Sequence, residues 1–170
     1  MHSVIEFKPF PLSPFVGEWI LDPLSVSRNK VVKRTLGEDG FRKLWACGSM
    51  EERAQCLATE PELAERYRSV LHVGRESNLV ITLQNITWIH LQSATLPAKT
   101  TVYPVVRVVS EGRKVLVHSI DIPERGRQSI IYVLRMNKRW LLFSQQFTGR
   151  QAQLFPRSPV FRYYASNGCR

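Results

Sequence analysis

The side chains that most often carry catalysis or bind metals are few and scattered in this sequence. The four histidines are His2, His72, His90 and His118, and no two have the spacing of metal ligands on one helix or strand. There is no Cys-x-x-Cys pair and no Gly-x-Ser-x-Gly nucleophile motif. Carboxylates that could pair for acid–base catalysis are almost absent from the β-rich half. We therefore expect no catalytic residue, no metal site, no cofactor and a non-enzymatic function.

Arginines within apolar, β-rich runs are the remaining candidates for binding. Side chains alternate along a strand, which gives each arginine apolar or aromatic neighbours on its own face: Tyr103, Val105 and Val109 for Arg107, Ile131 and Val133 for Arg135, and Tyr164 for Arg162. Such an arginine can bind both oxygens of a carboxylate. Alternatively, the aliphatic part of the arginine side chain packs on the sheet while its guanidinium reaches water. We favour this second interpretation for Arg107 and Arg135. The candidate ligand-binding residues are Arg162, Tyr164, Arg107 and Arg135.

The positive charge of the chain is concentrated in its second half. The net charge is +10; residues 1–77 contain 11 basic and 11 acidic residues, whereas residues 78–170 contain 13 basic and 3 acidic ones. This asymmetry creates a field that attracts anionic partners, such as a carboxylate ligand, lipid head groups, nucleic acid or an acidic protein surface. A surface that only aids solubility would show the same composition. Nucleic-acid binding is possible, but no recognised motif supports it.

The first half of the chain predicts one strand followed by helices. Residues 15–22 form an apolar run, after which Asp22 and Pro23 provide a typical helix start. Glycines and two capping-box patterns mark the later helix boundaries. Helices are expected from Pro23 to about Leu36, from Glu38 to Cys47, from Ser49 onward, and from Thr59 to near Gly74.

From Asn78 onward the hydrophobic period changes from helical to two. Seven β-rich runs follow, most of them separated by short turn signals such as Glu111-Gly112 and Asn137-Lys138. Connections this short join antiparallel neighbours. The second half therefore predicts a meander of about seven strands, to which residues 15–22 add one more.

Both ends of this strand series carry residues that resemble a known family. Phe15, Gly17 and Trp19 resemble the Phe-x-Gly-x-Trp opening of fatty-acid-binding proteins. Arg162 and Tyr164 are similar to the Arg-x-Tyr of the last strand, which in that family binds a ligand carboxylate. With the order of elements, the chain resembles the calycin superfamily of lipocalins and fatty-acid-binding proteins. The resemblance implies an α+β fold: an up-and-down antiparallel β-barrel of about eight strands with a helical block inserted after the first strand.

The glycine and the tryptophan of the first strand have a physical reason in such a barrel. Gly17 permits the bend and close backbone approach that closure requires. Trp19 shares its face and can close the narrow end of the barrel, with Phe15 beside it. We expect the guanidinium of Arg162 to lie on the Trp19 indole. Trp19 could also be a large core residue with no such special role.

The expected organisation is a single domain with two short extensions. Residues 1–14 form an extended, proline-rich arm, and residues 166–170 form a tail. Residues 15–165 form the lipocalin-like domain, with a helical insertion at 23–74 and a β-meander at 78–165. Fatty-acid-binding proteins carry only two short helices at that position, so the longer block could cap the barrel or fill the ligand entrance.

Two functions remain open from sequence. The barrel could hold a hydrophobic anionic ligand such as a lipid carboxylate. Alternatively, the protein is a non-catalytic accessory subunit that docks on a larger protein or nucleoprotein assembly through its basic face and N-terminal arm. Bulky apolar residues in the strands could fill the interior, which would favour the second function. Three cysteines and the lack of a secretory signal predict an intracellular, reducing compartment, cytoplasmic or organellar, and no apolar run is long enough for a transmembrane segment.

Overall fold

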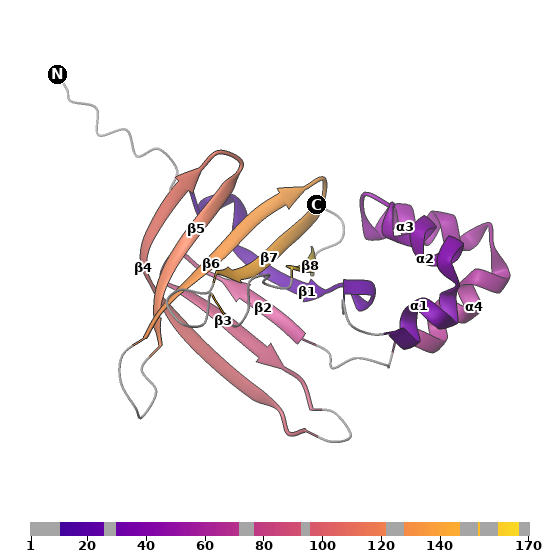
Figure 1. Ribbon diagram of the computed structural model, residues 1–170, viewed down its shortest axis with the longest axis horizontal. Coiled ribbons are helices and arrows are strands. Elements are labelled where there is room, and N and C mark those ends of the chain that lie inside the picture. Colours follow the sequence, from indigo (N-terminus) through magenta and orange to yellow (C-terminus); the bar gives the residue numbers. More distant parts are fainter. Residues whose placement is uncertain are drawn as a thin grey trace.

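The described part of the chain folds into a β-barrel with an attached helical block (Figure 1). The computed structural model describes residues 11–25, 30–71, 77–92, 96–121, 128–146, 153 and 160–166. The strands are β1 (Gly17–Leu21), β2 (Ser77–Ile81), β3 (Asn85–His90), β4 (Lys99–Glu111), β5 (Lys114–Asp121), β6 (Gln128–Asn137), β7 (Trp140–Gln146) and β8 (Val160–Ala165). The helices are η1 (Ser13–Phe15), η2 (Pro23–Ser25), α1 (Lys30–Leu36), α2 (Glu38–Trp45), α3 (Met50–Ala58) and α4 (Pro61–Val70).

The eight strands form a closed antiparallel barrel in sequence order. The barrel closes where β1 pairs with β8, with Ile20 opposite Tyr164, while the other edge of β1 pairs with β2. Every strand therefore has two neighbours, which leaves no open edge for pairing with another chain. The predicted α+β fold, an antiparallel barrel with helices inserted after its first strand, is confirmed.

The middle of the barrel is filled by aromatic side chains. Trp88 on β3 and Phe143 on β7 lie on strands four positions apart, which are opposite each other in an eight-stranded barrel, and their ring centroids are 5.4 Å apart. Tyr132 stacks on Phe143 at 5.0 Å, and Tyr163 contacts Phe143 edge-on at 6.1 Å. These rings join the side chains of both walls into one core. Its other buried members include Leu79, Ile81, Ile86, Val115, Val117, Ile130, Leu134 and Leu141.

One end of the barrel is closed by the segment that leads into β1. Trp19 is 6% exposed and packs in the same core as Leu12 and Phe15. Its indole Nε1 donates a hydrogen bond to the Phe15 carbonyl oxygen at 2.9 Å. Gly17 has φ +147°, a conformation that side-chain-bearing residues rarely adopt. The predicted burial of Trp19 is confirmed, and the glycine is required by the backbone turn at the start of the strand.

The four α-helices have a core of their own. Leu36, Leu44, Leu63, Tyr67 and Val70 are buried against one another in the block. This second core is separate from the barrel core, so the block must be fixed to the barrel by other contacts.

The capping-box prediction is confirmed for α3 and wrong for α4. The Ser49 side chain accepts a hydrogen bond from the Glu52 backbone nitrogen at 3.1 Å, so Ser49 caps α3. Thr59 instead ends α3, where its hydroxyl donates to the Cys56 carbonyl oxygen at 2.8 Å. Helix α4 starts one residue later, with Glu60 at the N-cap position and Pro61 in the first turn.

The predicted helix from Pro23 to Leu36 is also wrong at its start. Asp22 accepts a hydrogen bond from the Leu24 backbone nitrogen at 3.0 Å, but it caps only the short turn η2, and α1 begins later, at Lys30. The Ser25 hydroxyl accepts a hydrogen bond from the Arg162 backbone nitrogen. This bond fixes η2 to β8.

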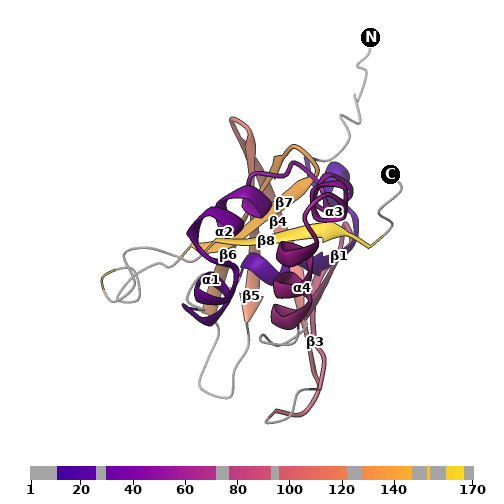
Figure 2. The same ribbon diagram turned by 90° about the vertical axis from the view of Figure 1, so that its right-hand side faces the viewer.

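The helical block lies on the outer surface of the barrel, over β7 and β8 (Figure 2). The uncovered side of the barrel is formed by β4, β5 and β6, on the left in Figure 1. Within the described residues, no helix is long and apolar enough to cross a membrane. Most of the predicted arm, residues 1–10, and residues 167–170 of the tail lie outside the described residues.

Candidate functional site

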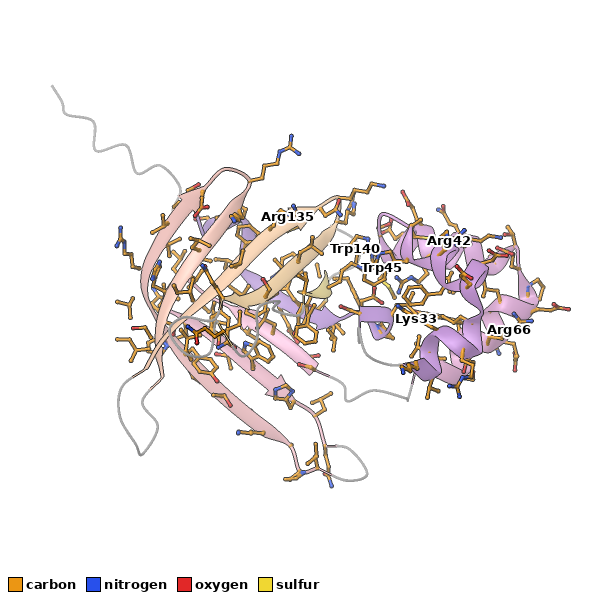
Figure 3. All side chains as sticks on the ribbon, viewed as in Figure 1. Lys33, Arg42, Trp45, Arg66, Arg135 and Trp140 are labelled. Carbon is orange, nitrogen blue, oxygen red and sulfur yellow. The ribbon has the colours of Figure 1, made fainter. Side chains whose placement is uncertain are left out.

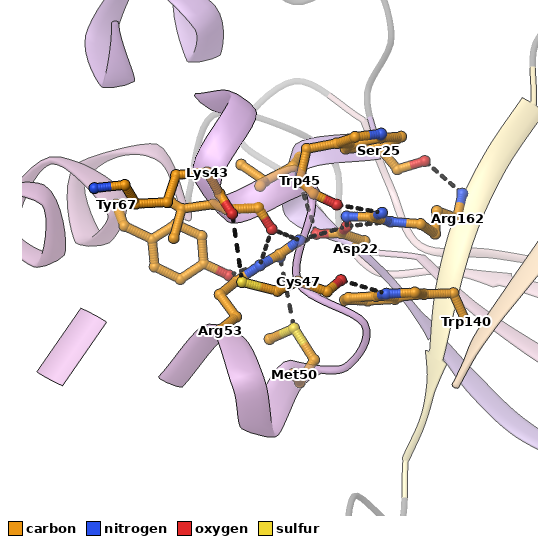
Figure 4. Close-up of polar contacts among 12 residues, drawn as sticks. Asp22, Ser25, Lys43, Trp45, Cys47, Met50, Arg53, Tyr67, Trp140 and Arg162 are labelled. Atoms are coloured by element: carbon orange, nitrogen blue, oxygen red, sulfur yellow. Dashed lines mark hydrogen bonds and ion pairs between the residues drawn. The ribbon is translucent and has the colours of Figure 1, made fainter. Parts of the chain in front are cut away.

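The block and the barrel meet at a buried cluster of charged and aromatic side chains, which we call the joint. It consists of Asp22 after β1, Arg53 on α3, Trp45 at the end of α2, Trp140 on β7 and Arg162 on β8 (Figure 4). Segments far apart in the chain therefore converge on one carboxylate. The joint is a buried, connected polar cluster at the boundary between the block and the barrel.

Asp22 is the centre of the joint and is fully buried. Its Oδ1 accepts a hydrogen bond from Arg53 Nη1 at 2.6 Å, and its Oδ2 accepts one from Arg53 Nη2 at 3.0 Å. Oδ2 also accepts a hydrogen bond from Arg162 Nε at 2.9 Å, and Arg162 Nη2 lies 2.8 Å away from the same oxygen. One carboxylate thus binds two guanidinium groups, one of them through both oxygens. Such charge-assisted pairs are stronger and more directional than neutral hydrogen bonds.

The guanidinium of Arg162 lies between two indole rings. Its central carbon is 3.6 Å from the ring centroid of Trp45 and 4.0 Å from that of Trp140. Its Nη1 also donates to the Trp45 carbonyl oxygen at 2.9 Å. Trp45 belongs to the block and Trp140 to the barrel. Arg162 therefore links the block to the barrel through the faces of these two indoles, as well as through Asp22.

Two backbone contacts strengthen the joint on its other side. The Trp140 indole Nε1 donates to the Cys47 carbonyl oxygen at 2.8 Å, and the Arg139 backbone nitrogen donates to the Gly48 carbonyl oxygen at 3.3 Å. The segment between α2 and α3 is therefore bound to the turn between β6 and β7.

Burial and the shared carboxylate act differently on the two arginines. For Arg162, burial lowers the pKa, and the attraction of Asp22 only partly offsets this effect. For Arg53, burial also lowers the pKa, but hydrogen bonds and charge attraction from Asp22 outweigh it and the net shift is upward. Both guanidinium groups stay protonated at neutral pH, since arginine loses its proton only at very high pH. The joint therefore carries two positive charges and one negative charge.

Tyr67 completes the polar contacts of Arg53 from α4. Arg53 Nη1 donates to the Tyr67 hydroxyl oxygen at 3.3 Å, and burial raises the pKa of that hydroxyl. Arg53 also donates through Nη2 to the Leu44 carbonyl oxygen at 3.3 Å. Together with the two bonds to Asp22, these contacts hold the Arg53 guanidinium in one position between α2, α3 and α4.

Arg162 and Tyr164 do not point into the barrel interior, as a ligand clamp there would require. Tyr163 points into the barrel core, so alternation along β8 directs both of its neighbours outward. Arg162 contacts the indoles of Trp45 and Trp140 instead of that of Trp19. Tyr164 lies edge-on to Trp140, with ring centroids 6.5 Å apart. Whether either residue contacts a ligand stays a prediction, but neither lines the barrel interior.

Arg107 and Arg135 both lie exposed on the outside of the barrel. A β-bulge between Val105 and Arg107 shifts the alternation of β4. Contrary to the expectation, Arg107 therefore does not share a face with Val105. On β6, Tyr132 and Leu134 face inward, and Arg135 faces outward with Val133, as predicted. The two arginines are therefore not together in a binding pocket with Arg162.

These two arginines belong to a larger group of exposed cations, which we call the basic face. Strand register places Lys114 directly opposite Arg135, and Arg107 opposite His118. Between these two rows lies an apolar row in which Val109, Leu116 and Val133 are paired across three strands. The turns at the ends of these strands add further exposed cations. The basic face comprises Arg107, Arg113, Lys114, Arg135, Lys138 and Arg139.

Few carboxylates balance the basic face. Lys114 Nζ lies 3.6 Å from a Glu111 carboxylate oxygen, and both side chains of this pair are largely exposed. Arg107, Arg113, Arg135 and Lys138 form no ion pair with any other described residue. Part of the positive charge that the sequence concentrates in the second half of the chain is therefore displayed on the surface, where it can act on a partner.

Sequence reasoning missed the cluster around Asp22, which is bound by both Arg53 and Arg162. The local pattern at Asp22 predicts only a helix cap, and pairs separated by 31 and 140 positions leave no local signal. One signal was present: Arg53 occupies an apolar position of α3, three residues after Met50 and four before Leu57. A charged residue on the buried stripe of a helix indicates a buried partner.

The fold and the site define the class of protein as an α+β chain with a closed eight-stranded antiparallel barrel and an anchored helical block. No protein-family model matches the chain, and searches of curated proteins and of solved structures find no significant match. The barrel is compatible with a calycin-like barrel. No three His, Cys, Asp or Glu side chains in the described ranges are grouped so that they could hold a metal ion.

Proposed function

We propose that the protein is a non-catalytic binding module that docks on an acidic protein partner through the basic face. In this account the barrel is a solid scaffold, and the joint holds the helical block in a fixed place on it. The observation that carries the proposal is the contact between Trp88 and Phe143 across the middle of the barrel. An acyl chain could not pass these rings without displacing them.

The candidate clamp of the ligand-binding hypothesis is already occupied. Arg162, the residue expected to bind a ligand carboxylate, is bound to the carboxylate of Asp22 and enclosed by two indoles. Releasing it to a ligand would leave Asp22 with Arg53 alone and break the link between block and barrel. Its arrangement favours a structural role over ligand capture.

The display of charge on the barrel supports the basic face as the working surface. In the block, Arg42 is paired with Glu38, Lys43 with Glu60 and Arg68 with Glu65. Arg107, Arg113 and Arg135 of the basic face form no ion pair within the described residues, and its central apolar row provides area that a partner could cover. Uncompensated surface charge accelerates and orients association with a surface of opposite sign.

We further propose a distant relationship to the calycin superfamily. The up-and-down order of the strands supports it, as does the position of Gly17 and Trp19 in the first strand. The relationship concerns the barrel, because the helical block is longer than the two short helices that fatty-acid-binding proteins carry at that position.

The proposal is tested with fluorescein-labelled poly-L-glutamate as a model of an acidic surface. Fluorescence anisotropy should show binding that weakens steeply with added salt. The variant Arg107→Glu/Arg135→Glu should weaken it by about tenfold or more, since each tenfold corresponds to about 1.4 kcal/mol. The matched control Arg66→Glu/Arg68→Glu makes the same charge change on α4 and should have little effect.

Three results would contradict the proposal. If the α4 control weakens poly-L-glutamate binding as much as Arg107→Glu/Arg135→Glu does, binding depends only on net charge. If the Arg107→Glu/Arg135→Glu variant binds poly-L-glutamate as the native chain does, the contact lies elsewhere on the surface. Tighter binding of a single-stranded DNA oligonucleotide than of poly-L-glutamate, lost in the same variant, would identify a nucleic-acid surface instead.

One observation favours a small ligand inside the barrel as the second candidate function. The Trp88 indole Nε1 is buried and has no hydrogen-bond partner among the described atoms. A ligand with a hydrogen-bond acceptor could satisfy it. A Trp88→Phe variant would then lose ligand affinity without losing its fold, and a saturable ligand titration of the native chain would favour this function over the scaffold.

A further inference from the structure

A groove on the helical block combines an apolar floor with a basic rim. It lies between α1 and α2, has a volume of about 580 Å³, and its lining is predominantly apolar. Phe41 and Trp45 form the floor, with Lys33, Arg34 and Arg42 around it and Glu38 as the acidic member. Figure 3 shows Lys33 on α1 and Arg42 and Trp45 on α2. The groove is separate from the basic face, which belongs to the barrel.

The two floor residues are stacked on each other, with Trp45 exposed and Phe41 half-buried. Their rings stack with centroids 5.8 Å apart and an angle of 12° between the planes. Trp45 is 38% exposed, although one side of its indole is covered by the guanidinium of Arg162. An indole fixed in this way presents apolar area without losing side-chain entropy on binding, a property of aromatic residues that anchor protein–protein contacts.

A continuous series of ring–cation contacts connects the groove to the joint. The Lys33 ammonium lies 5.2 Å from the centre of the Phe41 ring, Phe41 stacks on Trp45, and Trp45 stacks on Arg162. Arg162 in turn contacts Trp140 of the barrel. The floor of the groove is therefore supported by the buried anchor, and its shape does not depend on an occupant.

We propose that this groove binds an acidic peptide segment carrying an apolar anchor side chain. The anchor would pack on Phe41 and Trp45, and flanking carboxylates would pair with Lys33 and Arg34. Neither of these two cations forms an ion pair with another described residue, whereas Arg42 is already paired with Glu38 at 3.2 Å. Charge complementarity at the rim thus selects acidic over basic segments, and the apolar floor distinguishes this site from purely electrostatic attraction.

The inference goes beyond the proposed function, because it adds a second contact surface with a different chemistry. An acidic partner that reached both surfaces would gain from their combination, since the second contact becomes intramolecular once the first is made. Either surface can nevertheless exist without the other, so the two proposals are tested with different probes and different variants.

The test uses a fluorescein-labelled peptide of sequence Asp-Glu-Asp-Phe-Leu-Asp-Glu and a matched peptide in which Phe-Leu is replaced by Gly-Gly. Anisotropy titrations of the full chain should show saturable binding of the first peptide and about tenfold weaker binding of the second. Lys33→Glu/Arg34→Glu should weaken binding of the first peptide by about tenfold. Arg66→Glu/Arg68→Glu, the same charge change on α4, should leave it unchanged, as should Arg107→Glu/Arg135→Glu on the basic face.

Tryptophan emission provides a second readout at the floor. Binding of the Phe-Leu peptide should change the emission of the native chain, and the change should disappear in Trp45→Phe, which keeps an aromatic ring on Arg162. The proposal is overturned if the native chain does not bind the Phe-Leu peptide, or if it binds both peptides with equal affinity. It is also overturned if Lys33→Glu/Arg34→Glu keeps the native affinity for the Phe-Leu peptide. The same holds if the α4 control Arg66→Glu/Arg68→Glu loses as much of that affinity as Lys33→Glu/Arg34→Glu does. A failure here with intact poly-L-glutamate binding would refute the groove alone and leave the basic face standing.

Discussion

The barrel interior and the joint solve the same problem with opposite chemistry. Both hold distant segments together, but the barrel does so with apolar side chains such as Trp19 and Phe143, and the joint with a carboxylate and two guanidinium groups. Apolar packing stabilises roughly in proportion to the area buried and tolerates some variation in shape. A buried charge cluster contributes little net stability, but it strongly disfavours any arrangement that leaves a charge unpaired. The comparison suggests that the barrel supplies stability and the joint specifies where the block sits.

Removal of the Trp19 side chain from the barrel core should cause the largest loss in the free energy of unfolding. Trp19→Ala deletes an almost wholly buried indole and its hydrogen bond to Phe15. We expect a loss of about 3–5 kcal/mol in the free energy of unfolding, measured by urea denaturation. An unchanged melting temperature would contradict the role of Trp19 in closing the barrel.

Neutralising Asp22, the centre of the joint, should lower the free energy of unfolding slightly less than Trp19→Ala does. Its effect should be confined to the helical block. Asp22→Asn leaves the guanidinium groups of Arg53 and Arg162 without a counter-charge in a buried place. We expect a loss of about 3 kcal/mol together with increased hydrogen exchange in α2 and α3, while the amides of the barrel strands stay protected. Loss of protection throughout the barrel would show that the joint and the barrel core are one unit.

Two companion variants sharpen this prediction. Asp39→Asn removes a carboxylate whose side chain is 99% exposed, and it should leave stability unchanged. The triple variant Asp22→Leu/Arg53→Met/Arg162→Met replaces the buried charges by apolar side chains, and it should recover most of the loss seen for Asp22→Asn. If the triple variant is as unstable as the single one, the charges themselves contribute stability, contrary to the comparison.

High pH should weaken the barrel through Tyr163. Burial raises the pKa of its hydroxyl to about 12 from an ordinary value of 10.0. The folded state then keeps the proton in a range where the unfolded chain loses it, so stability is fully present below pH 10 and is lost as the pH rises toward 12. The loss should be about 2–3 kcal/mol, and Tyr163→Phe should abolish that part of the pH dependence in denaturation measured between these limits. An identical profile in the variant would assign the loss to other groups.

A substitution at Gly17, at the start of β1, should lower the free energy of unfolding least among these variants. Gly17 has φ +147°, and a Cβ there would meet open space, so Gly17→Ala adds conformational strain without a steric clash. We expect a loss of about 1–2 kcal/mol, within the range for strained backbone positions. Gly112→Asn is the matched control, because Gly112 has φ +63° in the left-handed region that asparagine tolerates. Equal losses for both variants would remove the argument for a special conformation at Gly17.

The elements of the fold followed from local patterns, and the site did not. Period-two alternation and turn residues predicted the eight strands, and the Ser49–Glu52 capping box predicted α3, because these signals lie within a few residues of one another. The bulge after Val105 reversed the predicted face of Arg107, since a single inserted residue is invisible to a periodicity argument. The partners of Arg162 were missed because they come from segments brought together only by barrel closure and by the docking of the block.

Titration of the native chain with a fluorescent fatty acid distinguishes a solid barrel with an external working surface from a barrel that admits a ligand. The contact between Trp88 and Phe143 predicts no saturable binding, and addition of the fatty acid should leave poly-L-glutamate binding unchanged. Saturable binding of one fatty acid per chain that depends on Trp88 would contradict the account, because it would show that these rings part to admit a ligand.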